Sequence, residues 1–189
     1  MRNIVFVILA TALAQPVLAE NSSSFSAGWY GDIHLGQTGT SLKQGEQSFD
    51  FLSIGGSYGY QYNEYFAAEF FGSFATDGEH DDIMSAILGQ EAKVKFDAIG
   101  AYLVGKTHGK YYLKARVGLI NSRFTYSAGG FEDETGSDTG FSYGFGAGVS
   151  LEKVNIELNY LQFPDVDDPL FNSTSYESDQ LTISIGTQF

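Results

Sequence analysis

The chain has 189 residues and a formal net charge of −13, from 10 Lys and Arg against 23 Asp and Glu, which disfavours nucleic-acid partners because these require basic patches. It has no Cys, which excludes a disulfide framework, thiol catalysis and Cys-ligated metals. The 23 Gly, 16 Phe and 12 Tyr, with only 3 Pro, indicate many strands joined by turns.

Residues 1–19 have the pattern of a secretory signal peptide. Arg2 supplies a positive start, residues 4–14 are apolar, and Val17-Leu18-Ala19 offers small residues for cleavage. The apolar run of about eleven residues is shorter than the ~20 that a membrane-spanning helix needs. We expect cleavage after Ala19, which leaves residues 20–189 as the exported domain.

Eight segments follow in which apolar residues recur at every second position, the period of a β-strand. One face of each segment is rich in Phe, Leu, Ile and Tyr, and the other is mostly Gly, Ser and Asn. The fourth segment is the weakest, because residues 99–104 are apolar on both faces. The segments lie near 25–36, 52–60, 66–74, 94–104, 113–122, 141–150, 155–160 and 181–189.

The chemistry of the two faces indicates which one points outward. A soluble barrel holds its large apolar side chains inside, whereas a membrane barrel presents them to lipid. The small polar residues here suit a narrow interior. Connections also alternate between short ones near 61–64, 106–110 and 152–153 and long ones near 37–48, 77–91, 127–138 and 164–179. The prediction is an all-β, eight-stranded antiparallel up-and-down transmembrane β-barrel with both ends periplasmic.

The predicted inward faces carry four acids and four bases: Asp32, Glu69, Asp97 and Glu157 against Lys93, Lys95, Lys114 and Arg116. Isolated buried charges are costly, so a balanced set indicates a paired interior network rather than an open pore. Asp32 and Lys93 have an alternative place at the wet rims. The candidate network is therefore Glu69, Lys95, Asp97, Lys114, Arg116 and Glu157.

Three stretches resemble a known family: Gly28-Trp29-Tyr30-Gly31, the turn region 59–70, and the terminal Phe189. Residues 25–189 look like the eight-stranded outer-membrane barrels of the OmpA transmembrane-domain and OmpX type. The resemblance implies a monomeric barrel in the bacterial outer membrane, inserted from the periplasm. It also implies that Phe189, with Ile183 and Ile185 before it, is read by the barrel-assembly machinery. Unlike full-length OmpA, the chain is expected to lack a peptidoglycan-binding domain.

The last three predicted external loops hold 14 of the 23 acids and no Lys or Arg. Such loops suit divalent cations beside lipopolysaccharide, or a basic partner, although a simply solvated acidic surface is the alternative. Asp165-Val166-Asp167-Asp168 is not an EF-hand, because Leu170 and Tyr176 occupy its Gly and Glu positions.

Catalytic motifs are missing from the sequence. The three His, at 34, 80 and 108, lack a nucleophile at the spacing of a lipid A deacylase, and no Gly-x-Ser-x-Gly or His-Glu-x-x-His occurs. We therefore expect no enzyme activity, no catalytic residue, no cofactor and no metal centre. The favoured role is structural or surface-interactive, in adhesion or envelope integrity. A narrow channel for small or apolar solutes, of the OmpW type, is the alternative, and a lipid A-modifying enzyme is less favoured.

Overall fold

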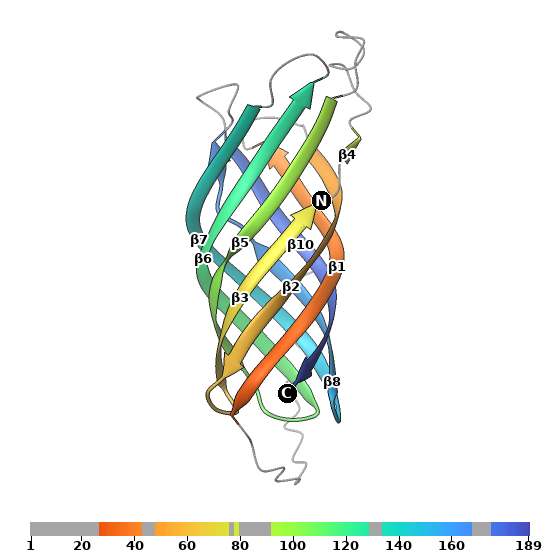
Figure 1. Cartoon of the computed structure of the whole chain (residues 1–189), viewed down its shortest axis with the longest axis vertical. Helices are drawn as coiled ribbons and strands as arrows, with labels where there is room; N and C mark the ends of the chain where they lie inside the picture. Colours follow the sequence, from red (N-terminus) through yellow and green to blue (C-terminus); the bar gives the residue numbers. More distant parts are fainter. Residues whose placement is uncertain (1–26, 43–47, 76–77, 80–91, 129–133, 168–174) are drawn as a thin grey trace, which may run out of the picture.

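A computed structural model describes residues 27–42, 48–75, 78–79, 92–128, 134–167 and 175–189, so the predicted signal peptide lies outside the described residues. Each of the eight long strands pairs antiparallel with the next, and β1 also pairs with β10, which closes the sheet into a barrel (Figure 1). Closure gives each long strand a hydrogen-bonded neighbour on both sides, the condition for crossing a bilayer with strands. The long strands are β1 (Gly28–Leu42), β2 (Ser48–Gln61), β3 (Phe66–Ala75), β5 (Ala92–Lys106), β6 (Tyr111–Ala128), β7 (Glu134–Leu151), β8 (Val154–Gln162) and β10 (Ser175–Gln188), and two short ones are β4 (Gly78–Glu79) and β9 (Val166–Asp167).

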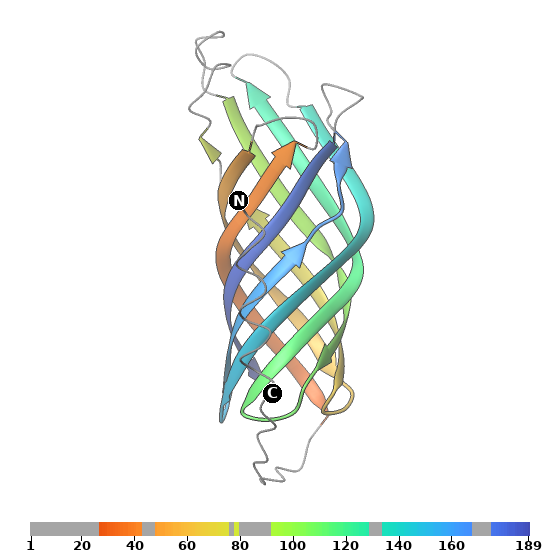
Figure 2. The same cartoon turned by 180° about the vertical axis from the view of Figure 1, so that it is seen from behind.

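The two ends of the barrel differ. The turns at 62–65, 107–110 and 152–153 and the C-terminus share one end, here called the turn end (Figures 1 and 2). In the first turn, the Asn63 side-chain oxygen accepts hydrogen bonds from the backbone N–H groups of Tyr65 and Phe66, both at 2.9 Å. The remaining connections lie at the opposite loop end. Three of them are shorter than predicted, because β1 extends to Leu42, β7 begins at Glu134 and β10 begins at Ser175, whereas the connection between β3 and β5 spans 76–91.

The outer surface of the wall is apolar, as the alternation predicts. Side chains such as Ile33, Phe70, Leu119 and Ile183 are 56–69% exposed, although they are large and hydrophobic. Aromatic rings gather at the turn end of this band, where Trp29 stacks on Tyr58 at 5.1 Å between ring centroids. Such belts are typical of the membrane interface. No helix in the described part of the chain is long and apolar enough to cross a membrane.

The faces exchange polarity toward the loop end. In register across β5, β6 and β7, the outward row Ala101–Leu119–Phe141 is apolar, but the rows beyond it are Asp97–Arg123–Ser137 and Lys95–Thr125–Thr135. The inward side chains of β5 and β6 at these levels are buried and mostly apolar instead: Phe96, Ala98 and Phe124, with Ser122 as the polar one. Toward the loop end, β5, β6 and β7 therefore extend beyond the apolar band. There their outer surface is polar, and the side chains that they point inward are mostly apolar.

Candidate functional site

An ion-pair network fills the barrel interior toward the turn end. The carboxylate of Glu69, on β3, lies 2.6 Å from Nζ of Lys114 and 2.7 Å from Nε of Arg116, both on β6. Glu157, on β8, lies 3.2 Å from Lys114 Nζ and 3.6 Å from Arg116 Nη2. The two acids and two bases balance in charge, so each buried ion faces opposite charges.

Neutral partners satisfy the remaining polar atoms of the network. Tyr30 donates its hydroxyl to Glu69 at 2.7 Å, and Tyr112 donates to Glu157 at 2.8 Å. Arg116 Nη1 donates to Asn159 Oδ1 at 2.8 Å. The tyrosine rings need glycine beside them: a Cβ at Gly59 would lie 2.7 Å from Cζ of Tyr30, and one at Gly148 would lie 2.5 Å from Cζ of Tyr112. The small inward residues of the sequence thus provide the space that this network occupies.

The next level of the interior holds neutral polar groups together with His34 and Asp32. The buried ring of His34 stacks on Phe71 at 5.1 Å, and its Nδ1 lies 3.6 Å from Asp32, whose side chain also points inward. Gln180 Nε2 lies within hydrogen-bond distance of the hydroxyls of Thr38, Ser53 and Ser73. His34 is therefore enclosed by the wall rather than placed at the bilayer surface.

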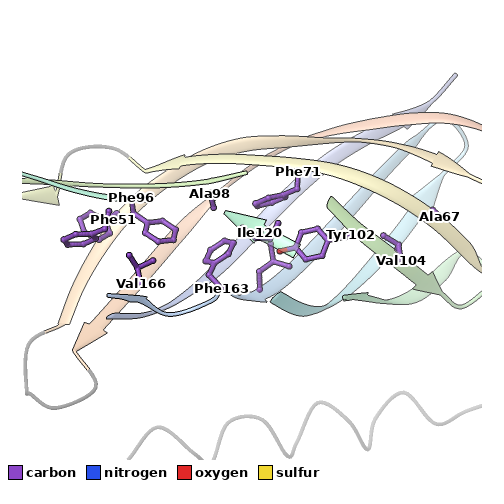
Figure 3. Close-up of a cluster of buried hydrophobic side chains, with 12 residues drawn as sticks. Phe51, Ala67, Phe71, Phe96, Ala98, Tyr102, Val104, Ile120, Phe163 and Val166 are labelled. Atoms are coloured by element: carbon purple, nitrogen blue, oxygen red, sulfur yellow. The ribbon is translucent and has the colours of Figure 1, made fainter. Parts of the chain in front are cut away.

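An apolar cluster closes the interior toward the loop end and continues along β3 and β5 to Tyr102, Val104 and Ala67, at the level of the ion-pair network (Figure 3). Phe163 packs on Phe96 at 5.3 Å and on Phe71 at 6.2 Å between centroids, because the chain after β8 turns into the barrel mouth and carries Phe163 and Val166 inward. Sequence reasoning missed this cluster. The available signal was the apolar character of both faces in residues 99–104 and in Leu119-Ile120. The full cluster is Phe51, Ala67, Phe71, Phe96, Ala98, Tyr102, Val104, Ile120, Phe124, Leu161, Phe163 and Val166.

Two members of the candidate network require correction. Lys95 and Asp97 lie on the outward face of β5, because Phe96 and Ala98 are the buried residues that alternate with them. Glu69, Lys114, Arg116 and Glu157 meet inside the barrel, but Lys95 and Asp97 are outside it. The side chain of Lys93 is not among those described.

Most of the acidic loop positions also lie outside the described side chains. Among those described, Asp50 on β2 and Asp179 on β10 both pair in register with Gly39 of β1, between them. A Cβ at Gly39 would lie 3.4 Å from Oδ1 of Asp50 and 2.9 Å from Oδ1 of Asp179. Within the described residues, no group of three or more His, Asp or Glu is placed to hold a metal ion. Of the 14 acids in the last three predicted loops, those outside the described side chains are Asp77, Glu79, Asp81, Asp82, Glu91, Glu132, Asp133, Glu134 and Asp168.

The predicted assembly signal lies on the outer wall at the turn end. Ile183 and Ile185 face outward from β10, and Phe189 stacks on Tyr58 at 6.4 Å. The backbone N–H of Phe189 donates to the carbonyl of Trp29 at 3.0 Å. The terminal residue therefore contacts the first two strands and contributes to barrel closure.

The chain belongs to the outer membrane protein beta-barrel domain family, whose model matches residues 5–189, and this places it in the bacterial outer membrane. No curated protein sequence matches it. Among solved structures, it is similar to Neisserial surface protein A (20% identity, 87% of this chain and 100% of that chain, TM-score 0.62). It is also similar to Ail of Yersinia pestis in complex with the heparin analogue sucrose octasulfate (16%, 86% and 99%, 0.56) and to OprG of Pseudomonas aeruginosa (13%, 86% and 96%, 0.53). At these identities the structural likenesses show the fold alone.

Proposed function

We propose that this protein is a non-enzymatic, monomeric surface protein of the outer membrane, in which the barrel is an anchor and the loop end faces outside. Its work is adhesion or envelope integrity through the acidic loops. The observation that carries this proposal is the filled interior: the ion-pair network toward the turn end and the apolar cluster, most of which lies toward the loop end, together occupy the lumen. An axial solute path would require both to move.

The charge of the loops selects among partners. With a net charge of −13 and loop acids that outnumber loop bases, the loop tips favour a basic or uncharged surface, or divalent cations beside lipopolysaccharide. They disfavour a polyanion at the tips, such as the sucrose octasulfate in the Ail complex. Calcium titration of the purified protein tests whether the loops bind divalent cations. A rise in the unfolding temperature at millimolar calcium supports cation binding, and an unchanged temperature excludes it.

Orientation is testable because the chain has no Cys, so a single introduced thiol is unique. Ser137→Cys lies on an exposed part of β7 at the loop end, and Lys153→Cys lies in an exposed turn at the other end. A membrane-impermeant maleimide should label the first variant on intact cells and the second only after permeabilisation. The reverse pattern would overturn the proposal.

Planar-bilayer conductance tests the closed interior. We expect the native barrel to be silent and the variant Glu69→Ala/Arg116→Ala/Phe71→Ala/Phe163→Ala to conduct, because it empties part of both the ion-pair network and the apolar cluster. The matched variant Glu64→Ala, which breaks the exposed pair with His108, should be silent as well. Steady conductance by the native protein, abolished by blocking the lumen, would instead indicate a channel.

The second candidate is a narrow passage for small apolar solutes, and one observation favours it. Pairing of β7 with β8 begins at Tyr143 and Gln162, whereas β7 continues toward the loop end as far as Glu134. Pro164 lies against Gly140 at this step in the wall, in front of the apolar cluster. Uptake of an apolar dye into vesicles distinguishes the candidates: a passage predicts faster entry with Phe163→Ala than with the native barrel, whereas an anchor predicts equal, protein-independent entry.

A further inference from the structure

The mouth of the barrel has a basic side and an acidic side. Lys95 on β5 and Arg123 on β6 point outward from the wall near the loop end, and both are exposed. On β2 and β10 the outward residues at this end are acidic: Asp50, Glu177 and Asp179. The sheet order places β5 and β6 across the barrel from β10, β1 and β2. Although the chain is strongly acidic, these two cations therefore lie together on one side of the barrel.

The two cations stand just beyond the apolar band. Arg123 is four residues past Leu119 along β6, and Lys95 is in register with Thr125, one row further. With a rise of about 3.4 Å per residue and a tilt of about 40°, Arg123 lies about 10 Å beyond the last fully apolar row. A phospholipid headgroup layer is only about 5–7 Å deep, so a lipid whose phosphates stand on sugars matches this height better.

The surroundings of the cations are rich in hydrogen-bond donors. Asn121 on β6, whose Nδ2 donates to Thr139 Oγ1 at 2.9 Å, lies one row below Arg123, and Thr125 lies one row above it. Asp97 is directly opposite Arg123 and is the one acid among the described outward side chains of β5 and β6. The Asn121 amide is engaged with β7, where it also donates to the Asp138 carbonyl at 3.4 Å. Guanidinium, ammonium and hydroxyl groups remain as a donor set that suits phosphate oxygens.

We propose that the outward face formed by Lys95, Arg123 and Thr125 binds phosphate groups of a phosphorylated glycolipid of the outer leaflet, of the lipopolysaccharide kind. The inference rests on the proposed function, in which the loop end faces outside. The acidic side of the mouth repels the same phosphates, so the lipid contact is confined to β5 and β6. Asp97 partly neutralises Arg123 and thereby weakens the contact.

The test uses the purified full barrel in phosphatidylcholine nanodiscs, with a fluorophore on Ser137→Cys, which is in register with Arg123. Lipopolysaccharide is titrated into each variant, and heat-modifiability confirms folding. Each basic residue near an anionic surface contributes about fivefold in affinity, so Lys95→Gln/Arg123→Gln should bind about 25-fold more weakly. The charge-matched control Lys110→Gln/Lys153→Gln, at the exposed turn end, should change by about twofold or less. Asp97→Asn should bind more tightly.

Dephosphorylated lipopolysaccharide should bind the native barrel as weakly as intact lipopolysaccharide binds the double variant. The proposal is overturned if the double variant keeps native affinity, if the control loses as much, or if dephosphorylation changes nothing. Both ends of a nanodisc are accessible, so these results do not depend on orientation in the cell. A negative result in this binding test can therefore be distinguished from a negative result in the whole-cell labelling experiment, which tests the proposed function.

Discussion

Glu69→Gln is the sharpest perturbation of the interior, because it removes one charge and nearly preserves shape. Glu69 is 2% exposed and contacts Lys114 at 2.6 Å, Arg116 at 2.7 Å and the Tyr30 hydroxyl at 2.7 Å. Removing one partner of a buried ion pair costs about 3–5 kcal/mol. We expect the lower end, about 3 kcal/mol, because Glu157 still faces both bases at 3.2 and 3.6 Å.

The free energy of unfolding can be measured by urea titration in phospholipid vesicles, with the single Trp29 as reporter. Glu69→Gln/Lys114→Met removes one charge of each sign and leaves Arg116 facing Glu157. This double variant should recover most of the free energy of unfolding that Glu69→Gln loses. The same substitution at the exposed pair, Glu64→Gln, should cost less than about 1 kcal/mol. The reasoning is refuted if Glu69→Gln unfolds at the native urea concentration, or if the double variant shows only the sum of the two single losses.

Three further predictions concern residues of the barrel wall. Phe189→Asp should lower outer-membrane levels and heat-modifiable protein, through the lost assembly signal and the lost contact with β2; normal levels would contradict the terminal-signal prediction. Gly118→Ala should destabilise the barrel by about 1–3 kcal/mol or more, since its Cβ would strike the Ala101 carbonyl, whereas Gly105→Ala meets open space and should be tolerated in the same urea titration. Val117→Arg, within the apolar band, should cost about 2–4 kcal/mol and Thr125→Arg about 1 kcal/mol or less; equal costs would mean that the band is misplaced.

The error at Lys95 and Asp97 has a physical cause. Alternation has the same period along the whole of β5, but its meaning depends on what surrounds the strand. Within the bilayer the apolar face points outward, toward lipid. Beyond it the exterior meets water and the apolar face turns inward, so Phe96 is buried and Lys95 is exposed. Periodicity reports two faces without saying where the membrane ends.

The network shows a similar division between sequence and structure. The inward positions of Glu69, Lys114, Arg116 and Glu157 could be predicted, because each lies opposite an apolar face within the band. Their pairing could not, since Glu69 and Arg116 are 47 residues apart and meet only across the lumen.

The amino-acid sequence by itself determined a closed barrel of eight strands with an apolar exterior, because two-residue periodicity and alternating connections are local properties of the chain. Only the tertiary structure decided which charges meet, how the loop end is filled and where basic residues gather on the wall. Those outcomes depend on distances between strands that curvature and register set, and no local pattern contains them.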